Sequence, residues 1–257
     1  MRNSGTIRIG IGGWVYPPWR GAFYPRSLRQ SEELAFASRH VTAIEINGTF
    51  YRIQTPASFR KWHDQTPNDF VFSLKGPRFL THRNELASAA PYIDRFLASG
   101  LVDLHDKLGP ILWQFAPTKQ FDAADFSAFL NLLPGERAGR KLRHVIEARH
   151  RSFQCPEFLD LLRQHGAAVA MVDDAHHPAF DELTADFVYL RLRRCAEDEP
   201  AGYPPDAIDR WAERLNAWSA EGRDCFLYFI NGAKIRAPAA AQALIGRLST
   251  TERRHDA

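Results

Sequence analysis

The stretch that decides the fold is residues 41–75, VTAIEINGTFYRIQTPASFRKWHDQTPNDFVFSLK. Two short apolar runs rich in β-formers, Val41–Ile46 and Phe70–Leu74, flank a segment with helical spacing that begins near Ala57. A connection long enough to hold a helix is typical of two strands that run parallel, whereas antiparallel neighbours need only a short turn. The stretch therefore predicts a strand-helix-strand unit and a parallel sheet.

The same alternation repeats along the chain about eight times, which is the number of units in a (β/α)₈ TIM barrel. The predicted strands are Ile7–Ile11, Val41–Ile46, Phe70–Leu74, Ile111–Phe115, Val145–Ala148, Ala168–Val172, Val188–Leu192 and Phe226–Ile230. The predicted helices begin near Ser31, Ala57, Ala90, Ala123, Pro156, Pro205 and Ala237. The sixth connection, residues 173–186, is short, and a helix is not expected there.

One domain is the simplest organisation, because no stretch rich in Gly, Ser or Pro is long enough to act as a linker. We assign residues 1–250 to a single α/β TIM-barrel domain and residues 251–257, which are polar, to a frayed tail. An open, doubly wound sheet would show the same alternation. The early glycines Gly10, Gly12 and Gly13 lead into Trp14 and prolines, which argues against the dinucleotide-binding turn of that fold.

Composition bounds the class of protein. Hydrophobic residues make up 45% of the chain and the net charge is +3, so there is a core to bury and no global field that would imply nucleic acid or an anionic membrane. Three widely spaced cysteines argue against a disulfide framework, and no signal peptide or long apolar run is present. We expect a cytoplasmic protein with no membrane partner.

Polar residues stand at the carboxyl ends of nearly all predicted strands. Side chains alternate across a strand, so if the bulky apolar residues pack outward against the helices, their neighbours face the barrel interior. The residues predicted to face inward at the mouth are Glu45, Asn47, Ser73, Lys75, Gln114, Glu147, Arg149, Asp173, Arg191, Arg193 and Asn231. Barrel enzymes carry their chemistry at this end, and the mixed charges there either pair as a structural plug or serve a ligand.

The loops that follow the strands add further candidates. Trp14, Tyr16 and Tyr51 would form a stacking wall or simply a lid of core aromatics. His82 follows the third strand in a basic loop suited to phosphate or carboxylate, and His150 follows the fifth. Candidate catalytic residues are thus Glu45, Glu147, Lys75 and His82. Candidate ligand-binding residues are Trp14, Tyr16, Asn47, Tyr51, Gln114, Arg149, His150, Asp173, Arg191, Arg193 and Asn231.

No cofactor is predicted, although one loop offers metal donors. Asp173, Asp174, His176 and His177 lie close together and, with Glu45 or Glu147, would supply oxygen and nitrogen ligands to a divalent ion. Their spacing matches no metal-site signature. No metal ligand is therefore assigned.

Several phrases, taken together in chain order, resemble the YecE-like family, a domain of unknown function. They are Ile9-Gly10-Ile11-Gly12-Gly13-Trp14, Phe23-Tyr24-Pro25, Glu45-Ile46-Asn47-Gly48-Thr49-Phe50-Tyr51, Lys75-Gly76-Pro77-Arg78, Thr81-His82, Lys107-Leu108-Gly109-Pro110, Gln114-Phe115 and Glu147-Ala148-Arg149-His150. The resemblance runs from about Ile7 to Leu248 and implies a TIM barrel, similar in general shape to the xylose-isomerase and endonuclease IV group, with no activity to carry over.

The chain departs from the family pattern at three strand ends. Arg193-Arg194 stands where members commonly have His-Gly, Ala116-Pro117 where they often have Pro-Pro, and Ile230-Asn231 where they usually have Asn-Asn. A second arginine in place of a histidine favours anions and removes one acid or base.

Four functions remain open. The first is an enzyme acting on a phosphorylated sugar or nucleotide-like anion, held by Lys75, Arg149 and Arg191, with Glu147 or Glu45 moving a proton. The second is a nucleic-acid-binding barrel that uses arginines and rings around the mouth. The third is a metal-dependent hydrolase or isomerase, and the fourth is a ligand sensor without catalysis. The sequence gives no oligomeric state.

Overall fold

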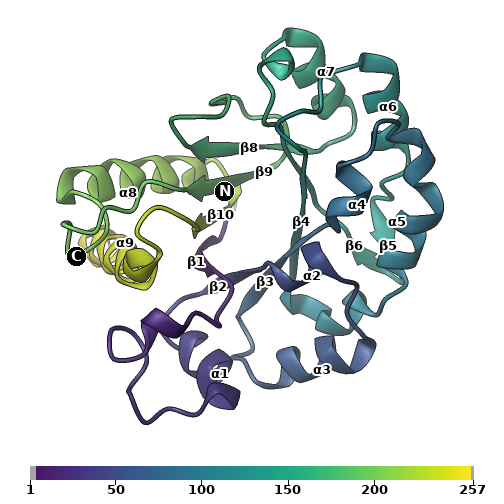
Figure 1. Ribbon diagram of the computed structural model, residues 1–257. Helices are drawn as coiled ribbons and strands as arrows, with labels where there is room; N and C mark the ends of the chain where they lie inside the picture. The colour runs from purple at the N-terminus through teal and green to yellow at the C-terminus, as the bar shows by residue number, and fades with distance from the viewer. Residues whose placement is uncertain (1–3, 256–257) are drawn as a thin grey trace.

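Eight parallel strands pair into a closed ring, which confirms the predicted barrel. They are β1 (Ile7–Gly12), β2 (Ala43–Ile46), β3 (Val71–Lys75), β4 (Leu108–Gln114), β7 (His144–Glu147), β8 (Ala168–Asp173), β9 (Phe187–Leu192) and β10 (Asp224–Phe229). Their order around the ring is β1-β10-β9-β8-β7-β4-β3-β2 (Figure 1). The computed structural model describes residues 4–255, and side chains for residues 4–249.

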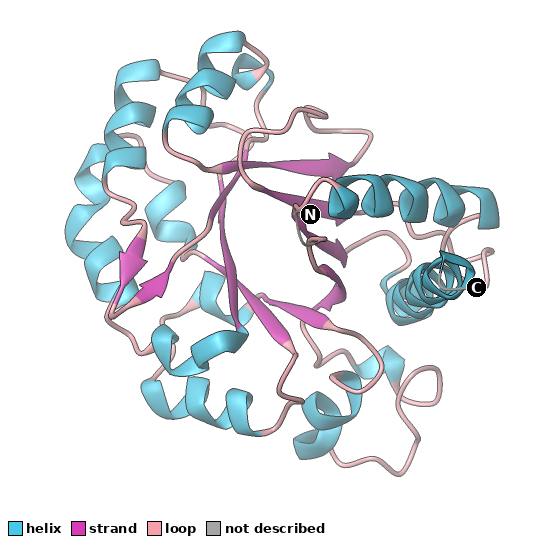
Figure 2. Cartoon of the chain, turned by 180° about the vertical axis from the view of Figure 1, so that it is seen from behind, coloured by secondary structure: helices cyan, strands magenta, loops and turns pink. Residues whose placement is uncertain are grey.

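Helices surround the ring of strands (Figure 2). They are α1 (Glu33–Ala37), α2 (Gly48–Tyr51), α3 (Pro56–Asp64), α4 (Arg78–Thr81), α5 (Ala90–Leu97), α6 (Ala123–Asn131), α7 (Pro156–Gln164), α8 (Pro205–Ala220) and α9 (Ala237–His255). Short 3₁₀ turns span Pro17–Trp19, Gln30–Glu32, Ala87–Ala89, Leu101–Lys107, Arg151–Phe153 and Lys234–Arg236. A small hairpin joins β5 (Glu136–Arg137) to β6 (Arg140–Lys141).

The helix starts follow local sequence signals. Proline occupies the first turn of α3, α7 and α8, where its missing amide costs nothing. The sixth connection contains no helix, as expected. The short helices α2 and α4 were not predicted from the sequence. At the carboxyl end, α9 keeps helical backbone to His255, whereas the sequence analysis placed a frayed tail from residue 251.

Two separate cores confirm the predicted alternation across the strands. One packs the outward side chains, such as Ile44, Leu74 and Trp113, against the helices. The other fills the barrel interior with alternate residues, such as Ala43, Leu112 and Tyr228. Since the interior core occupies the lower barrel, the polar side chains at the strand ends lie on top of it, facing the mouth.

Gly76 shows how closely the barrel wall is packed just beyond Lys75. A Cβ atom at this position would lie 2.4 Å from Cε3 of Trp113, which is too close for any side chain. Glycine here lets the chain leave β3 over the buried indole and turn into α4. Among the residues that the structure describes, no helix has the length and apolar character needed to cross a membrane.

Candidate functional site

Arg191, on β9, is the centre of the polar layer above the interior core. Its guanidinium is 2% exposed and donates to both carboxylate oxygens of Glu45, with Nε 2.9 Å from Oε2 and Nη2 3.0 Å from Oε1. Nη1 donates to Oε2 of Glu147 and, at 3.3 Å, to Oε1 of Gln114. Strands β2, β4, β7 and β9 thus bring four of the predicted inward residues into direct contact.

Every oxygen of the two carboxylates has a partner. Oε1 of Glu147 accepts from Nε of Arg149 at 2.6 Å, and Oε2 of Glu45 also accepts from the Tyr189 hydroxyl at 2.9 Å. Burial alone would raise the pKa of Glu147, but the charges of Arg191 and Arg149 outweigh it and lower that pKa to about 2. The same carboxylates hold the pKa of Arg191 above its ordinary value. Glu147 is therefore held as an anion, and the hydrogen bonds of both glutamates orient the arginines.

Lys75, at the end of β3, is buried without a polar partner. The side chain is 6% exposed, and Nζ lies 4.0 Å from the centroid of the Phe50 ring. Among the described residues, no hydrogen bond or ion pair reaches Nζ. Burial first, and then the charge of Arg191, lower the pKa of Lys75 to about 8, although Glu45 and Glu147 act in the opposite direction.

A cavity of about 800 Å³ opens above these side chains at the carboxyl ends of the strands. Ten of the predicted site residues line it: Trp14, Asn47, Tyr51, Lys75, His82, Gln114, Arg149, Arg191, Arg193 and Asn231. Glu45 and Glu147 lie beneath them and contact Arg191 from below. His82 lies near Lys75, because its ring packs edge-on against Phe50 at 5.7 Å. Burial, followed by the charge of Arg78, lowers the pKa of His82.

Three predicted ligand-binding residues lie elsewhere. Tyr16 packs on Trp19 outside the cavity lining. His150 borders a neighbouring hollow and contacts the Ser152 hydroxyl through Nδ1 at 2.8 Å. Asp173 was predicted to face inward, and this is wrong.

The error at Asp173 follows from the alternation in β8. Ala170 and Val172 fill the barrel interior, so Met171 and Asp173 point outward. Asp173 accepts from the Tyr203 hydroxyl at 3.1 Å and pairs with Arg194 at 2.9 Å, on the helix side of the sheet. It therefore does not take part in the mouth cavity.

The cavity also contains residues that the sequence analysis missed. Lys234, in the 3₁₀ turn after β10, and Arg52, after α2, add two cations to the lining. Trp62, on α3, packs edge-on against Trp14 at 5.4 Å and completes an aromatic wall. The position of Lys234 just after the last strand is a signal that identifies it, whereas nothing in the helical pattern around Trp62 marks that ring as a cavity residue.

The donors suggested for a divalent ion do not gather. Asp174 pairs with Arg193, and Asp173 faces away from the mouth. Among residues 4–249, whose side chains the structure describes, no group of three or more His, Cys, Asp or Glu side chains has the geometry to hold a metal ion. In this loop, Asp174 instead forms an ion pair that holds the Arg193 side chain.

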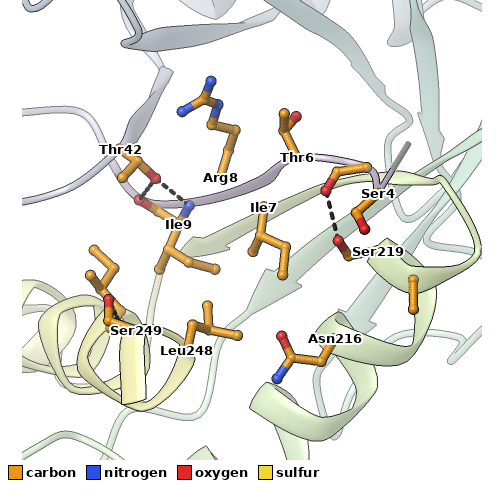
Figure 3. A pocket seen from close by; sticks show the side chains of 13 residues that line it. Ser4, Thr6, Ile7, Arg8, Ile9, Thr42, Asn216, Ser219, Leu248 and Ser249 are labelled. Atoms are coloured by element: carbon orange, nitrogen blue, oxygen red, sulfur yellow. Dashed lines mark hydrogen bonds between the residues drawn. The ribbon is translucent and has the colours of Figure 1, made fainter. Parts of the chain in front are cut away.

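A second hollow of about 570 Å³ lies between β1, α8 and α9, at the amino end of β1 (Figure 3). Serine, threonine, asparagine and aliphatic side chains line it, and the Ser219 hydroxyl donates to the Gly5 carbonyl at 2.6 Å. Arg8 supplies its only charge within the described residues, and that side chain points to the other side of the strand. This hollow therefore presents far less charge to a ligand than the mouth cavity does.

With the fold and the mouth described, the chain can be compared with known proteins. The family described as "Protein of unknown function DUF72" matches residues 8–257. The chain belongs to the DUF72 family. This confirms the resemblance to YecE-like proteins and, like it, identifies no reaction.

The relatives of this DUF72 chain are bacterial. UPF0759 protein YunF of Bacillus subtilis is 32% identical over 88% of this chain and 89% of its own length. UPF0759 protein YecE of Escherichia coli is 29% identical over 57% of this chain, and the match spans 50% of YecE. The chain therefore aligns with about half the length of that relative.

Solved structures agree on the fold. A DUF72 family protein from Thermotoga maritima aligns with a TM-score of 0.73 at 22% identity, covering 96% of this chain and 99% of its own. Another from Enterococcus faecalis gives 0.74 at 17% identity, covering 95% and 96%. SacUVDE aligns with a TM-score of 0.53 at 11% identity, covering 96% and 99%. At these identities the likeness concerns the barrel alone.

Proposed function

We propose that the mouth cavity binds a small anionic molecule, a phosphorylated sugar or a nucleotide-like compound, and that the protein is an enzyme acting on it. One observation carries the proposal. Six cationic side chains line the cavity and, within the part of the chain that the structure describes, no carboxylate does. These cations are Arg52, Lys75, Arg149, Arg191, Arg193 and Lys234.

Acidic neighbours largely neutralise the charges of three of the four arginines in the lining. Arg191 and Arg149 pair with Glu45 and Glu147, and Arg193 pairs with Asp174. Arg52, Lys75 and Lys234 have no acidic partner among the described residues. Because charges attract strongly in a partly enclosed cavity of low dielectric, three unpaired cations favour an anion there.

The apolar part of the lining fits a flat or ring-shaped body attached to that anion. Four aromatic residues line the cavity: Trp14 from the loop after β1, Phe50 and Tyr51 from α2, and Trp62 from α3. Aromatic faces stack on sugars and bases. A phosphate held by the cations and a ring held by these side chains would together fill the cavity.

In this arrangement we assign proton transfer to Lys75 and His82. Glu45 and Glu147, the first choices from the sequence, have every oxygen bonded, and the low pKa of Glu147 makes it a poor base. Lys75 and His82 both line the cavity and both have lowered pKa values, so their neutral forms exist near pH 7–8. We assign the glutamates to positioning Arg191 and Arg149.

The three cysteines are free, which fits the cytoplasmic location we propose.

The first test is calorimetric titration with AMP and with ribose 5-phosphate, using ribose as the uncharged comparison. We expect both phosphates to bind and ribose to bind at least tenfold more weakly. Lys75→Met should weaken AMP binding at least tenfold, because it removes an unpaired cation from the lining. Lys61→Met, the same change on an exposed residue of α3, is the matched control. Equal binding of ribose and ribose 5-phosphate would refute the proposal.

A second candidate, binding of single-stranded nucleic acid, is favoured by the surface beside the mouth. Tyr51 is 69% exposed and Tyr92 is 41% exposed, and each ring lies under a guanidinium, of Arg78 at 5.9 Å and Arg83 at 4.9 Å. Exposed rings interleaved with arginines stack bases without reading sequence. Binding of a labelled oligothymidylate that falls steeply with salt, and is lost in Tyr51→Ala, would support this candidate. No binding at low salt would eliminate it.

A further inference from the structure

Two lysines of this chain are buried, and they differ in how their ammonium groups are bonded. Nζ of Lys107 donates to the carbonyls of His63 and Thr66, at 2.5 and 2.8 Å, and to the Thr66 hydroxyl at 3.2 Å. Nζ of Lys75 has no such acceptor and faces the mouth cavity. Lys107 has the bonding of a structural lysine. Lys75 has the bonding of a group kept available for a ligand.

The surroundings of Lys75 make its neutral amine easier to form than that of an exposed lysine. Burial removes water from the ammonium, and the guanidiniums of Arg191 and Arg149 oppose its charge. The carboxylates of Glu45 and Glu147, which would restore the charge, are tied to those same arginines. An amine that is desolvated and placed next to cations is the usual form of a nucleophilic lysine.

We propose that Lys75 is a nucleophile that forms an imine with the aldehyde or keto group of an anionic substrate. This inference rests on the proposed function, because the cations of the lining would bring the anionic substrate to the amine. Lys107 lacks this role, since its Nζ is bonded to three acceptors and does not face the cavity.

The covalent step balances without any outside oxidant or reductant. The lone pair of Nζ attacks the carbonyl carbon, and the carbonyl oxygen takes up a proton to give a carbinolamine. Loss of the hydroxyl group together with the second N–H proton, as water, then leaves the carbon–nitrogen double bond, so both protons of the amine end in the departing water. His82, which contacts the same Phe50 ring as Lys75, is placed to carry these protons from nitrogen to oxygen.

The test is reductive trapping of the wild-type protein with glyceraldehyde 3-phosphate and sodium cyanoborohydride, read by peptide mass mapping. The reductant delivers hydride to the imine carbon and makes the link permanent. The chain contains six lysines, so the modified position is identified directly. We expect the adduct at Lys75, with at least tenfold less from glyceraldehyde, which has the same aldehyde and no phosphate. Labelling should rise with pH, reach half its maximum near pH 8 and level off about one pH unit higher.

One variant distinguishes the nucleophilic amine of Lys75 from its positive charge, and a second variant, at Lys107, is the matched control. Lys75→Arg keeps the positive charge and removes the nucleophile, so we expect it to lose the adduct and to bind AMP, which has no carbonyl that reacts with an amine, more tightly than Lys75→Met does. Lys107→Arg should leave labelling at Lys75 unchanged. The circular dichroism spectrum of each variant reports whether it is folded, and the wild-type map remains decisive if a variant is not.

The outcomes distinguish the two proposals. AMP binding without an adduct at Lys75 would overturn the imine and leave the anion site standing. An adduct spread over the exposed lysines, or confined to Lys234, would also overturn it. Failure of both AMP binding and trapping would reject the anion site together with the imine.

Discussion

At the scale of single residues, the buried position of the Lys75 ammonium lowers the free energy of unfolding. A buried ammonium without a hydrogen bond loses its hydration and gains only a ring contact in return. Folding lowers the pKa of Lys75 to about 8 from 10.5, so the unfolded chain binds more protons between those values. The cost is fully present below pH 8 and disappears as the pH rises toward 10.5.

We therefore expect Lys75→Met to stabilise the protein at pH 7, by roughly 3 kcal/mol at about 1.36 kcal/mol per pKa unit. The gain over the wild type should shrink as pH rises from 8 to 10. Urea unfolding at several pH values measures it, with Lys61→Met as the control. A loss of stability at pH 7 would mean that the ammonium has a bonded partner in the folded protein.

At the scale of elements, the alternation along each strand predicted most of the site from sequence. Glu45, Lys75, Gln114, Glu147 and Arg191 meet because each stands one residue away from an outward apolar side chain. The rule fails where regular strand geometry ends. Tyr16 and His150 lie in loops, whose paths depend on packing that no periodicity encodes. Trp62 enters the cavity from a helix, for the same reason.

The outward position of Asp173 on β8 can be tested directly by mutation. Since this carboxylate lies on the helix side of β8, with Tyr203 and Arg194, we expect Asp173→Asn to leave AMP binding within twofold of the wild type. Its stability should fall by no more than about 1 kcal/mol, the net value of one hydrogen bond. Lys75→Met serves as the positive comparison in the same titration. A tenfold loss of affinity in Asp173→Asn would place the carboxylate back in the site.

At the scale of the whole molecule, the ion cluster connects distant parts of the barrel wall. Strands β2, β7 and β9 are not neighbours in the ring, yet Arg191 binds Glu45 and Glu147 from the other two. Sequence predicted which residues face inward, but not this pairing, because the contacts depend on the register with which the ring closes. The cluster is thus both the floor of the cavity and a brace across the barrel.

This bracing makes the stability of the whole barrel sensitive to acid. The pKa of Glu147 is about 2 in the folded protein and 4.5 ordinarily, so its contribution is complete above pH 4.5 and is lost as the pH falls toward 2. At neutral pH, Glu147→Gln should cost roughly 3 kcal/mol, because Arg191 and Arg149 lose a buried counter-charge. Below pH 2 the variant and the wild type should converge, since protonation has then removed the charge of Glu147 that the variant already lacks. Thermal unfolding between pH 1.5 and 7 tests this, with the exposed Glu213→Gln as control. A constant difference across that range would mean that Glu147 does not stabilise the barrel through its charge.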